Sequence, residues 1–265
     1  MAAITLDRFY PVTLTLLRMV AGFLFWQHGA QKLLGWFGGT PAPAFSLFWI
    51  AGILEFVSAP LILAGLFTQP VALLLCGEMA VAFLTQHLPK GFWPVQNQGV
   101  QALQFCFIFL TLATAGPGRF SLDGLRAQRD ELSQTLSKFY PLALPALRIM
   151  TAFLFWQFGA RKFFGWLGGR PVPFGQLRWF AGVLETFGSP LIALGAVTRP
   201  LAFLLSGEMA VAFWISHFPR GFQGDGFWPI QNGGEGSVLF CFIFLFLVTA
   251  GPGKPSVDRL LCKKS

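Results

Sequence analysis

The stretch LRMVAGFLFWQHGAQKLLGWFGG, residues 17–39, returns as LRIMTAFLFWQFGARKFFGWLGG at residues 147–169. The shift of 130 residues continues through CGEMAVAF (76–83) and SGEMAVAF (206–213). After a small insertion near residues 223–226 the shift becomes 135, and GFWPVQN (91–97) is repeated as GFWPIQN (226–232). Because a repeat at a fixed period marks a duplicated structural unit, we predict that the chain consists of two copies of one unit.

The composition of the chain points to lipid as its main solvent. Hydrophobic residues make up 54% of it, charged residues only 11%, and the mean hydropathy is +0.61. A soluble domain carries about 25% charged residues. The net charge of +8 fits basic residues at the ends of membrane spans, where they contact anionic headgroups. Lysine and arginine form no stripe and no nucleic-acid-binding motif, so we expect no nucleic-acid partner.

The apolar segments predict an all-α integral membrane protein with eight transmembrane helices, arranged as two parallel-repeat four-helix bundles. Each segment is long enough to cross a hydrocarbon core of about 30 Å. Residues 1–118 form the first unit, residues 119–140 a polar linker that includes a short surface helix, and residues 141–265 the second unit. The expected spans lie near residues 11–35, 46–67, 70–88, 100–116, 141–165, 176–197, 200–218 and 236–251.

The number of spans fixes the expected topology. With four spans in each copy, both copies enter the membrane from the same side, and the two termini and the linker share that side. That side has more lysine and arginine than the opposite one, which places both termini in the cytoplasm. The small-residue run 41–44 resembles a signal cleavage site, but the second copy repeats it at 171–174, so we interpret it as a loop.

Charged residues inside the expected spans are the candidates for catalysis. An unpaired charge near the centre of a bilayer costs about 3 kcal/mol on insertion scales, so such residues are expected to pair. We expect one guanidinium to face two carboxylates in each copy. The cluster either locks the helices in register or handles a substrate or protons. Its members are Arg18, Glu55 and Glu78 in the first copy, and Arg148, Glu185 and Glu208 in the second.

A second polar layer lies toward the side opposite the termini and supplies the candidate substrate-binding residues. Its tryptophans are expected to anchor the membrane interface, and its histidines are either proton carriers or structural hydrogen-bonding residues. Three histidines and four cysteines without a C-x-x-C pair predict no metal or haem site. The candidates are His28, Lys32, His87, Trp93, Asn97, Lys162, His217, Trp228, Asn232 and Glu235.

Several motifs together resemble the DoxX family. They are L-R-x5-F-L-F-W-Q-H-G-A-Q-K-L-x-G-W-F-G-G, the G-x-L-E of the second span, G-E-M-A-V-A-F, H-L-P-K-G-F, N-G-G-E (232–235) and G-P-G-R-F-S-L-D (116–123). The resemblance covers nearly the whole chain, twice, apart from the linker. It implies a four-helix bundle per copy in the bacterial cytoplasmic membrane. It also implies a link to quinone or sulfur redox chemistry, as in membrane subunits of thiosulfate:quinone oxidoreductase, or a role as membrane partner of a detoxifying oxidoreductase.

Each copy departs from the shared pattern at a different polar residue. The second copy has Phe158 where the first has His28, and the first copy has Val100 where the second has Glu235. One hypothesis is a single composite site at the interface, formed by His28 from one half and Glu235 from the other. The alternative is drift after duplication.

Three functions remain open at this point. The first is a membrane redox subunit that binds quinone in an aromatic pocket and receives electrons from a partner oxidoreductase, since the chain encodes no electron carrier and no covalently bound cofactor. The second is a transporter or channel for a small solute or protons. The third is a membrane scaffold for a partner enzyme. A homologue with one copy would be expected to pair, so the duplicated chain is expected to act alone.

Overall fold

The computed structural model describes residues 6–125, 131–224 and 226–262, and every regular element in these ranges is helical. Short 3-10 turns join the longer helices. The α-helices are α1 (Tyr10–Leu34), α2 (Leu47–Ala64), α3 (Thr68–Ala82), α4 (Pro94–Asn97), α5 (Val100–Ala115), α6 (Glu131–Ser137), α7 (Tyr140–Phe163), α8 (Leu177–Leu194), α9 (Thr198–Ala212), α10 (Pro229–Asn232), α11 (Glu235–Ala250) and α12 (Val257–Cys262). Turns of π-helix, Phe83–His87 and Phe213–His217, extend α3 and α9.

A helix lies at each of the eight ranges expected from the sequence. In the described part of the chain, five helical segments are long and apolar enough to cross a membrane. These five are Leu6–Leu34, Leu47–Ala64, Thr68–Lys90, Tyr140–Phe163 and Thr198–Gln223. The helices α5 and α11 are apolar but have only 16 residues each, and α8 contains Arg178 and Glu185. The described residues therefore form an all-helical fold of the kind found in membrane proteins.

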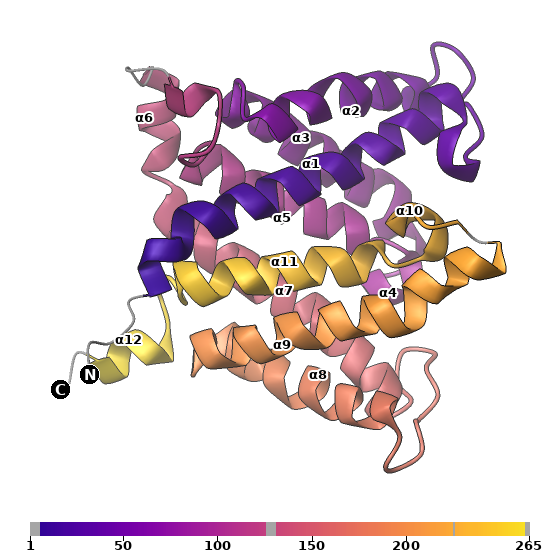
Figure 1. Cartoon of the computed structure of the whole chain (residues 1–265), viewed down its shortest axis with the longest axis vertical. Coiled ribbons are helices and arrows are strands. Elements are labelled where there is room, and N and C mark those ends of the chain that lie inside the picture. Colours follow the sequence, from indigo (N-terminus) through magenta and orange to yellow (C-terminus); the bar gives the residue numbers. More distant parts are fainter. Residues whose placement is uncertain (1–5, 126–130, 225, 263–265) are drawn as a thin grey trace.

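The two repeats pack against each other through their first and last long helices. Within the first repeat α1 packs on α2 and α3 on α5, and the second repeat copies this with α7 on α8 and α9 on α11. Between the repeats, α1 packs on α11 and α5 on α7. These four helices form the middle of the molecule, with α2 and α3 on one side and α8 and α9 on the other (Figure 1). The buried core therefore runs through both copies.

A pseudo-two-fold axis relates the halves and passes between two tyrosines. Tyr10 and Tyr140 are equivalent residues of the two copies, and the Tyr10 hydroxyl donates to the Tyr140 hydroxyl at 3.0 Å. Aromatic residues also cross between the copies. The ring of Trp93 stacks on Phe153 of the second repeat, and Trp228 packs on Phe23 of the first. Corresponding contacts on both sides of the axis give the interface its symmetry.

The helices run along one direction, so the molecule has two distinct ends (Figure 1). The start of α1, α12 and α6 lie at one end, which we call the terminal end (Figure 1). The expected linker contains α6, while its residues 126–130 lie outside the described residues. The connections that follow α1 and α7 lie at the opposite end with α10, which we call the loop end. The first and last described helices and α6 therefore share one end, whereas residues 1–5 and 263–265 lie outside the described residues.

Two glycines bring the first two helices of each repeat into backbone contact. A Cβ at Gly29 would lie 2.5 Å from the backbone nitrogen of Phe56, and one at Gly159 would lie 2.4 Å from that of Thr186. Real Cβ atoms do not approach backbone so closely, so only glycine permits this crossing. The crossing brings the last turn of α1 level with Glu55, and that of α7 level with Glu185.

Candidate functional site

The expected cluster of one arginine with two glutamates does not form. Arg18 Nη1 instead donates to the carbonyls of Ile62 (2.6 Å) and Leu63 (2.7 Å), and Nη2 donates to Phe120 O at 2.6 Å. Arg148 likewise donates to the carbonyls of Pro252 and Pro255. Both guanidinium groups are buried and lie toward the terminal end. The prediction that Arg18 and Arg148 face the membrane carboxylates is therefore wrong.

The physical reason is that backbone carbonyls can accept from a guanidinium here: those of Ile62 and Leu63 at the end of α2, and those of Phe120, Pro252 and Pro255 in the loops after α5 and α11. The last four carbonyls of a helix have no partner within it, and a buried cation satisfies them while matching the helix dipole. The motif 116–123 completes this arrangement. Its Asp123 accepts from the backbone N–H groups of Phe67 and Thr68 at 3.0 and 2.8 Å, which caps α3. Asp258 caps α9 in the same way. Arg18 and Arg148 thus have a structural role, since their hydrogen bonds join the terminal end of the second helix in each repeat, or the loop beside it, to the rest of the repeat.

The buried glutamates pair with lysines that arrive from the loop end. Lys32 Nζ bonds to Glu55 Oε1, and Lys162 Nζ bonds to Glu185 Oε1. Both carboxylates are 1% exposed, whereas the lysines keep about a quarter of their surface. The lysine stem crosses the apolar layer and carries its ammonium to the carboxylate. Because both repeats have the same Lys–Glu spacing, each half contains one buried ion pair.

The third glutamate of each set differs from the second, since it has no direct partner in the part of the chain that the structure describes. Both carboxyl oxygens of Glu78 and of Glu208 are buried and make no hydrogen bond within the described ranges. Glu78 lies within electrostatic reach of Glu55 and Lys32, and Glu208 within reach of Glu185 and Lys162. Buried polar atoms without partners are rare and point to a ligand or a proton. The carboxyl groups of Glu78 and Glu208 are therefore the groups of the site that are available to bind a ligand or a proton.

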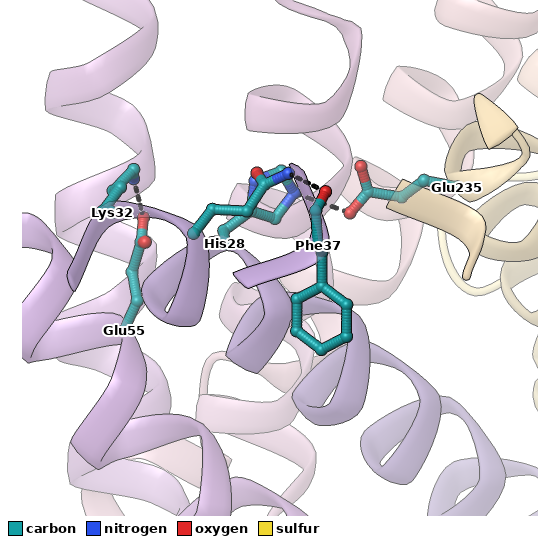
Figure 2. Close-up of polar contacts among 6 residues, drawn as sticks. His28, Lys32, Phe37, Glu55 and Glu235 are labelled. Carbon is teal, nitrogen blue, oxygen red and sulfur yellow. Dashed lines mark hydrogen bonds and ion pairs between the residues drawn. The ribbon is translucent and has the colours of Figure 1, made fainter. Parts of the chain in front are cut away.

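His28 and Glu235 meet across the repeat interface, as the composite-site hypothesis expected. His28 Nε2 lies 2.7 Å from Glu235 Oε1, and Glu235 is the first residue of α11. Figure 2 shows the Lys32–Glu55 pair on one side of His28 and Glu235 on the other. Nearby, the Gln31 side chain donates to Phe37 O at 3.3 Å. Glu55 and Lys32 both act electrostatically on the His28 ring. The proximity is confirmed, and its role stays a prediction.

The remaining polar candidates hold the loop end together. His87 Nδ1 lies 3.0 Å from Asn97 O, and His217 Nδ1 lies 3.3 Å from Asn232 O. The side chain of Asn97 bonds Gly91 O and Gly99 N, and that of Asn232 bonds Phe227 O and Gly234 N. These contacts favour the structural interpretation of both histidines. Trp93 and Trp228 pack on the opposite repeat, and their anchoring at the membrane interface stays a prediction.

A cavity of about 820 Å³ lies in the second repeat. Its walls are apolar and aromatic, with Phe155, Phe158, Phe180, Phe203 and Phe240 among them. Its polar lining residues include Lys162, Glu185, Glu208, Arg178, His217 and Gln101. The cavity therefore joins the ion pair and the open carboxyl of one repeat with a glutamine of the other.

Sequence reasoning missed two residues of this cavity and one feature of its wall. Arg178 replaces Phe48 of the first copy, and Gln101 comes from the opposite repeat. A comparison of the copies would have revealed Arg178, since it is a charge gained in one copy only. The π-helical turn that ends at His217 leaves no recognisable signal in the sequence. Within the described ranges, no group of three or more His, Cys, Asp or Glu is placed to hold a metal.

Comparison with known proteins gives a consistent family assignment. The DoxX family matches residues 13–88 and again residues 143–218. An uncharacterized protein of Haemophilus influenzae is 38% identical over 133 residues, which are 49% of this chain and 98% of that protein. Inner membrane protein YphA of Escherichia coli is 32% identical over 127 residues, 45% of this chain and 90% of YphA. An uncharacterized membrane protein of Mycobacterium tuberculosis is 33% identical over 89 residues, 32% of this chain and 55% of that protein. No solved structure matches.

The two family matches together cover more than half of the chain, and each falls on one repeat. The relatives from Haemophilus influenzae and Escherichia coli have about the length of one repeat. The chain belongs to the DoxX family, as a tandem duplication of one family unit.

Proposed function

We propose that this DoxX-family protein is the membrane subunit of a redox system and binds a quinone in the cavity of the second repeat. The observation that carries the proposal is the carboxyl group of Glu208. Both of its oxygens are buried without a hydrogen-bond partner among the described residues, and the residue lines a cavity of about 820 Å³. A protonated carboxyl group at this position has a hydrogen to donate and an apolar space into which to donate it.

The chemistry of a quinone matches these groups. Its ring and isoprenoid tail are apolar and fit phenylalanine walls, whereas its carbonyl oxygens need hydrogen-bond donors. Glu208 and Lys162 are donors on the polar side of the cavity. Reduction to quinol takes two electrons and two protons. A partner oxidoreductase supplies the electrons, and the buried carboxyl groups pass the protons.

The placement in the membrane is part of the same proposal. All eight long helices cross the bilayer as two four-helix bundles, with both termini on the cytoplasmic side of a bacterial inner membrane. The shared terminal end and the apolar helices support this arrangement. The 16-residue α5 and α11 cover about 24 Å at the helical rise, and their flanking turns make up the rest of the span.

The test uses a substitution that fills the cavity without disturbing the fold. Gly207 lines the cavity, and a Cβ at this position would meet nothing within 4 Å. Leucine also favours a helix more than glycine does, so Gly207→Leu is expected to fold. The variant should lose the quinone that co-purifies with the wild type, measured by mass spectrometry of extracted lipids. Gly77→Leu is the matched control, because Gly77 is equivalent in the first repeat and also has open space.

The result also separates the redox proposal from transport. If wild type and Gly207→Leu carry equal amounts of quinone, or none, the proposal fails. Proton flux by the purified protein in liposomes, lost on Glu208→Gln without any bound quinone, would establish transport in its place.

A further inference from the structure

A second pocket adjoins the large cavity at the loop end of the second repeat. It has a volume of about 510 Å³. Phe158, Lys162 and Arg178 line both spaces, and Arg161 and Arg170 complete the basic wall of the smaller one. The two spaces together offer a strongly basic compartment next to an apolar one.

The chain folds back on itself to build this basic wall. After α7, the N–H of Val172 donates to Lys162 O at 2.8 Å. Gly169 lies so close to the last turn of α7 that a Cβ there would be 2.5 Å from Arg161 O. This return of the chain holds Arg170 beside the end of α7, where Arg161 and Lys162 are located.

Within the described residues, the protein neutralises only part of the positive charge of the pocket. Lys162 pairs with Glu185, and the same carboxylate also acts on Arg178. Across residues 6–125, 131–224 and 226–262, no acidic side chain forms an ion pair with Arg161 or Arg170. Like charges held together cost free energy, so a cluster of this kind favours an anion.

The basic wall is particular to the second repeat. Arg161, Arg170 and Arg178 correspond to Gln31, Thr40 and Phe48 of the first. A general need for charge at the membrane surface would act on both copies alike. The three arginines therefore serve this pocket rather than the fold that the repeats share.

We propose that the pocket binds the phosphate of an anionic phospholipid, with an acyl chain in the adjoining apolar cavity, which the lipid chain and the quinone would then occupy in turn. Guanidinium groups bind phosphate oxygens through paired hydrogen bonds, and basic pockets beside membrane helices take lipid headgroups. The adjoining phenylalanine-rich cavity favours a lipid over a free anion, because it offers apolar surface to a tail. This inference goes beyond the redox function and does not rest on it.

The experiment compares lipids that differ in headgroup charge. Detergent-purified protein is titrated with phosphatidylglycerol or phosphatidylcholine, and binding is followed by native mass spectrometry and by the shift in unfolding temperature. The wild type should bind phosphatidylglycerol preferentially. The variant Arg161→Gln/Arg170→Thr/Arg178→Phe, which adopts the residues of the first repeat, should lose about tenfold in affinity for each arginine that contacts the phosphate. Arg170→Thr alone, on an exposed loop, should give part of this loss.

The control removes the same charge at the other end of the molecule. Arg119, Lys254 and Arg259 are exposed at the terminal end, and their replacement by glutamine should leave phosphatidylglycerol binding unchanged. Equal binding of the two lipids by the wild type, or equal losses in the pocket and control variants, would overturn the proposal. Inorganic phosphate is titrated in parallel. A stabilisation by phosphate equal to that by phosphatidylglycerol would overturn the lipid assignment.

Discussion

At the scale of single residues, the pair formed by His28 and Glu235 separates the two halves of the molecule most clearly. Glu235 is 5% exposed, and its carboxylate meets the His28 ring at 2.7 Å. At the corresponding positions across the pseudo-two-fold axis the chain has Phe158 and Val100. The same interface thus carries a polar pair on one side and apolar residues on the other.

This arrangement allows a double-mutant cycle in which the double variant has the residues found at the equivalent positions of the other side, Phe158 and Val100. His28→Phe leaves Glu235 without its partner, and Glu235→Val leaves the histidine, so each should lower the free energy of unfolding by about 2–3 kcal/mol. The double variant reproduces Phe158 and Val100 and should recover most of that loss. Thermal or denaturant unfolding in detergent measures the four proteins.

The cycle also tests the composite-site hypothesis. If the two residues act as a unit, His28→Phe alone should abolish quinone-linked turnover with the partner as fully as the double variant does. Independent, additive losses of turnover would contradict a shared site. Full turnover in the stable double variant would show that the pair serves packing only.

The residues also show what the sequence could and could not predict. Each copy lacks the polar residue that the other copy has, and this pattern was the basis of the hypothesis that His28 and Glu235 meet at the interface, which the structure confirms. The partners of Arg18 were not predictable in this way. They are the backbone carbonyls of Ile62, Leu63 and Phe120. Because every residue has a backbone carbonyl, the sequence does not indicate which carbonyls would accept these hydrogen bonds. The pairing of Lys32 with Glu55 was also not predicted, because the long lysine side chain carries its ammonium group across apolar surface to the carboxylate.

At the scale of helices, the close crossing of α1 and α2 sets the position of the ion pair. Gly29→Ala places a Cβ 2.5 Å from Phe56 N, so the helices must separate. We expect a loss of about 1–3 kcal/mol in unfolding free energy, as for other overpacked sites. Gly77→Ala is the control, since nothing lies within 4 Å of its Cβ and alanine favours the helix by about 1 kcal/mol.

The two variants are compared by thermal unfolding in the same detergent. A wild-type unfolding temperature for Gly29→Ala would contradict the close approach of α1 and α2.

Helix positions were predictable because apolar runs and their breaks are local signals. The π-helical turns before His87 and His217 were not, because they depend on packing between helices.

At the scale of the whole molecule, the repeats meet through a continuous interface of α1 with α11 and α5 with α7. Tyr10–Tyr140, Thr13–Thr249 and His28–Glu235 add hydrogen bonds along it. We therefore expect the fragments 1–125 and 126–265, expressed together without a covalent link, to co-purify as one complex. A tag on one fragment and size-exclusion chromatography measure this, and fragments that purify separately would contradict it.

The duplication was readable from the sequence, whereas the way the copies pack was not. The repeat predicted two similar units but gave no information on which helices face each other. That choice follows from buried surfaces such as those of Phe105 and Phe246, which are apolar like the lipid-facing residues and cannot be distinguished from them by composition.

Tyr10 and Tyr140, which are equivalent residues of the two copies, meet at the interface between them, and this bears on how such a protein can evolve. In a homodimer of single units, a true symmetry axis at this place would force every mutation to occur on both sides at once. Fusion into one chain removes that restriction, so one half can retain an older surface while the other acquires new side chains. The arginines around the smaller pocket, and the histidine that faces a glutamate only once, are changes that a symmetric ancestor would have had to make in pairs.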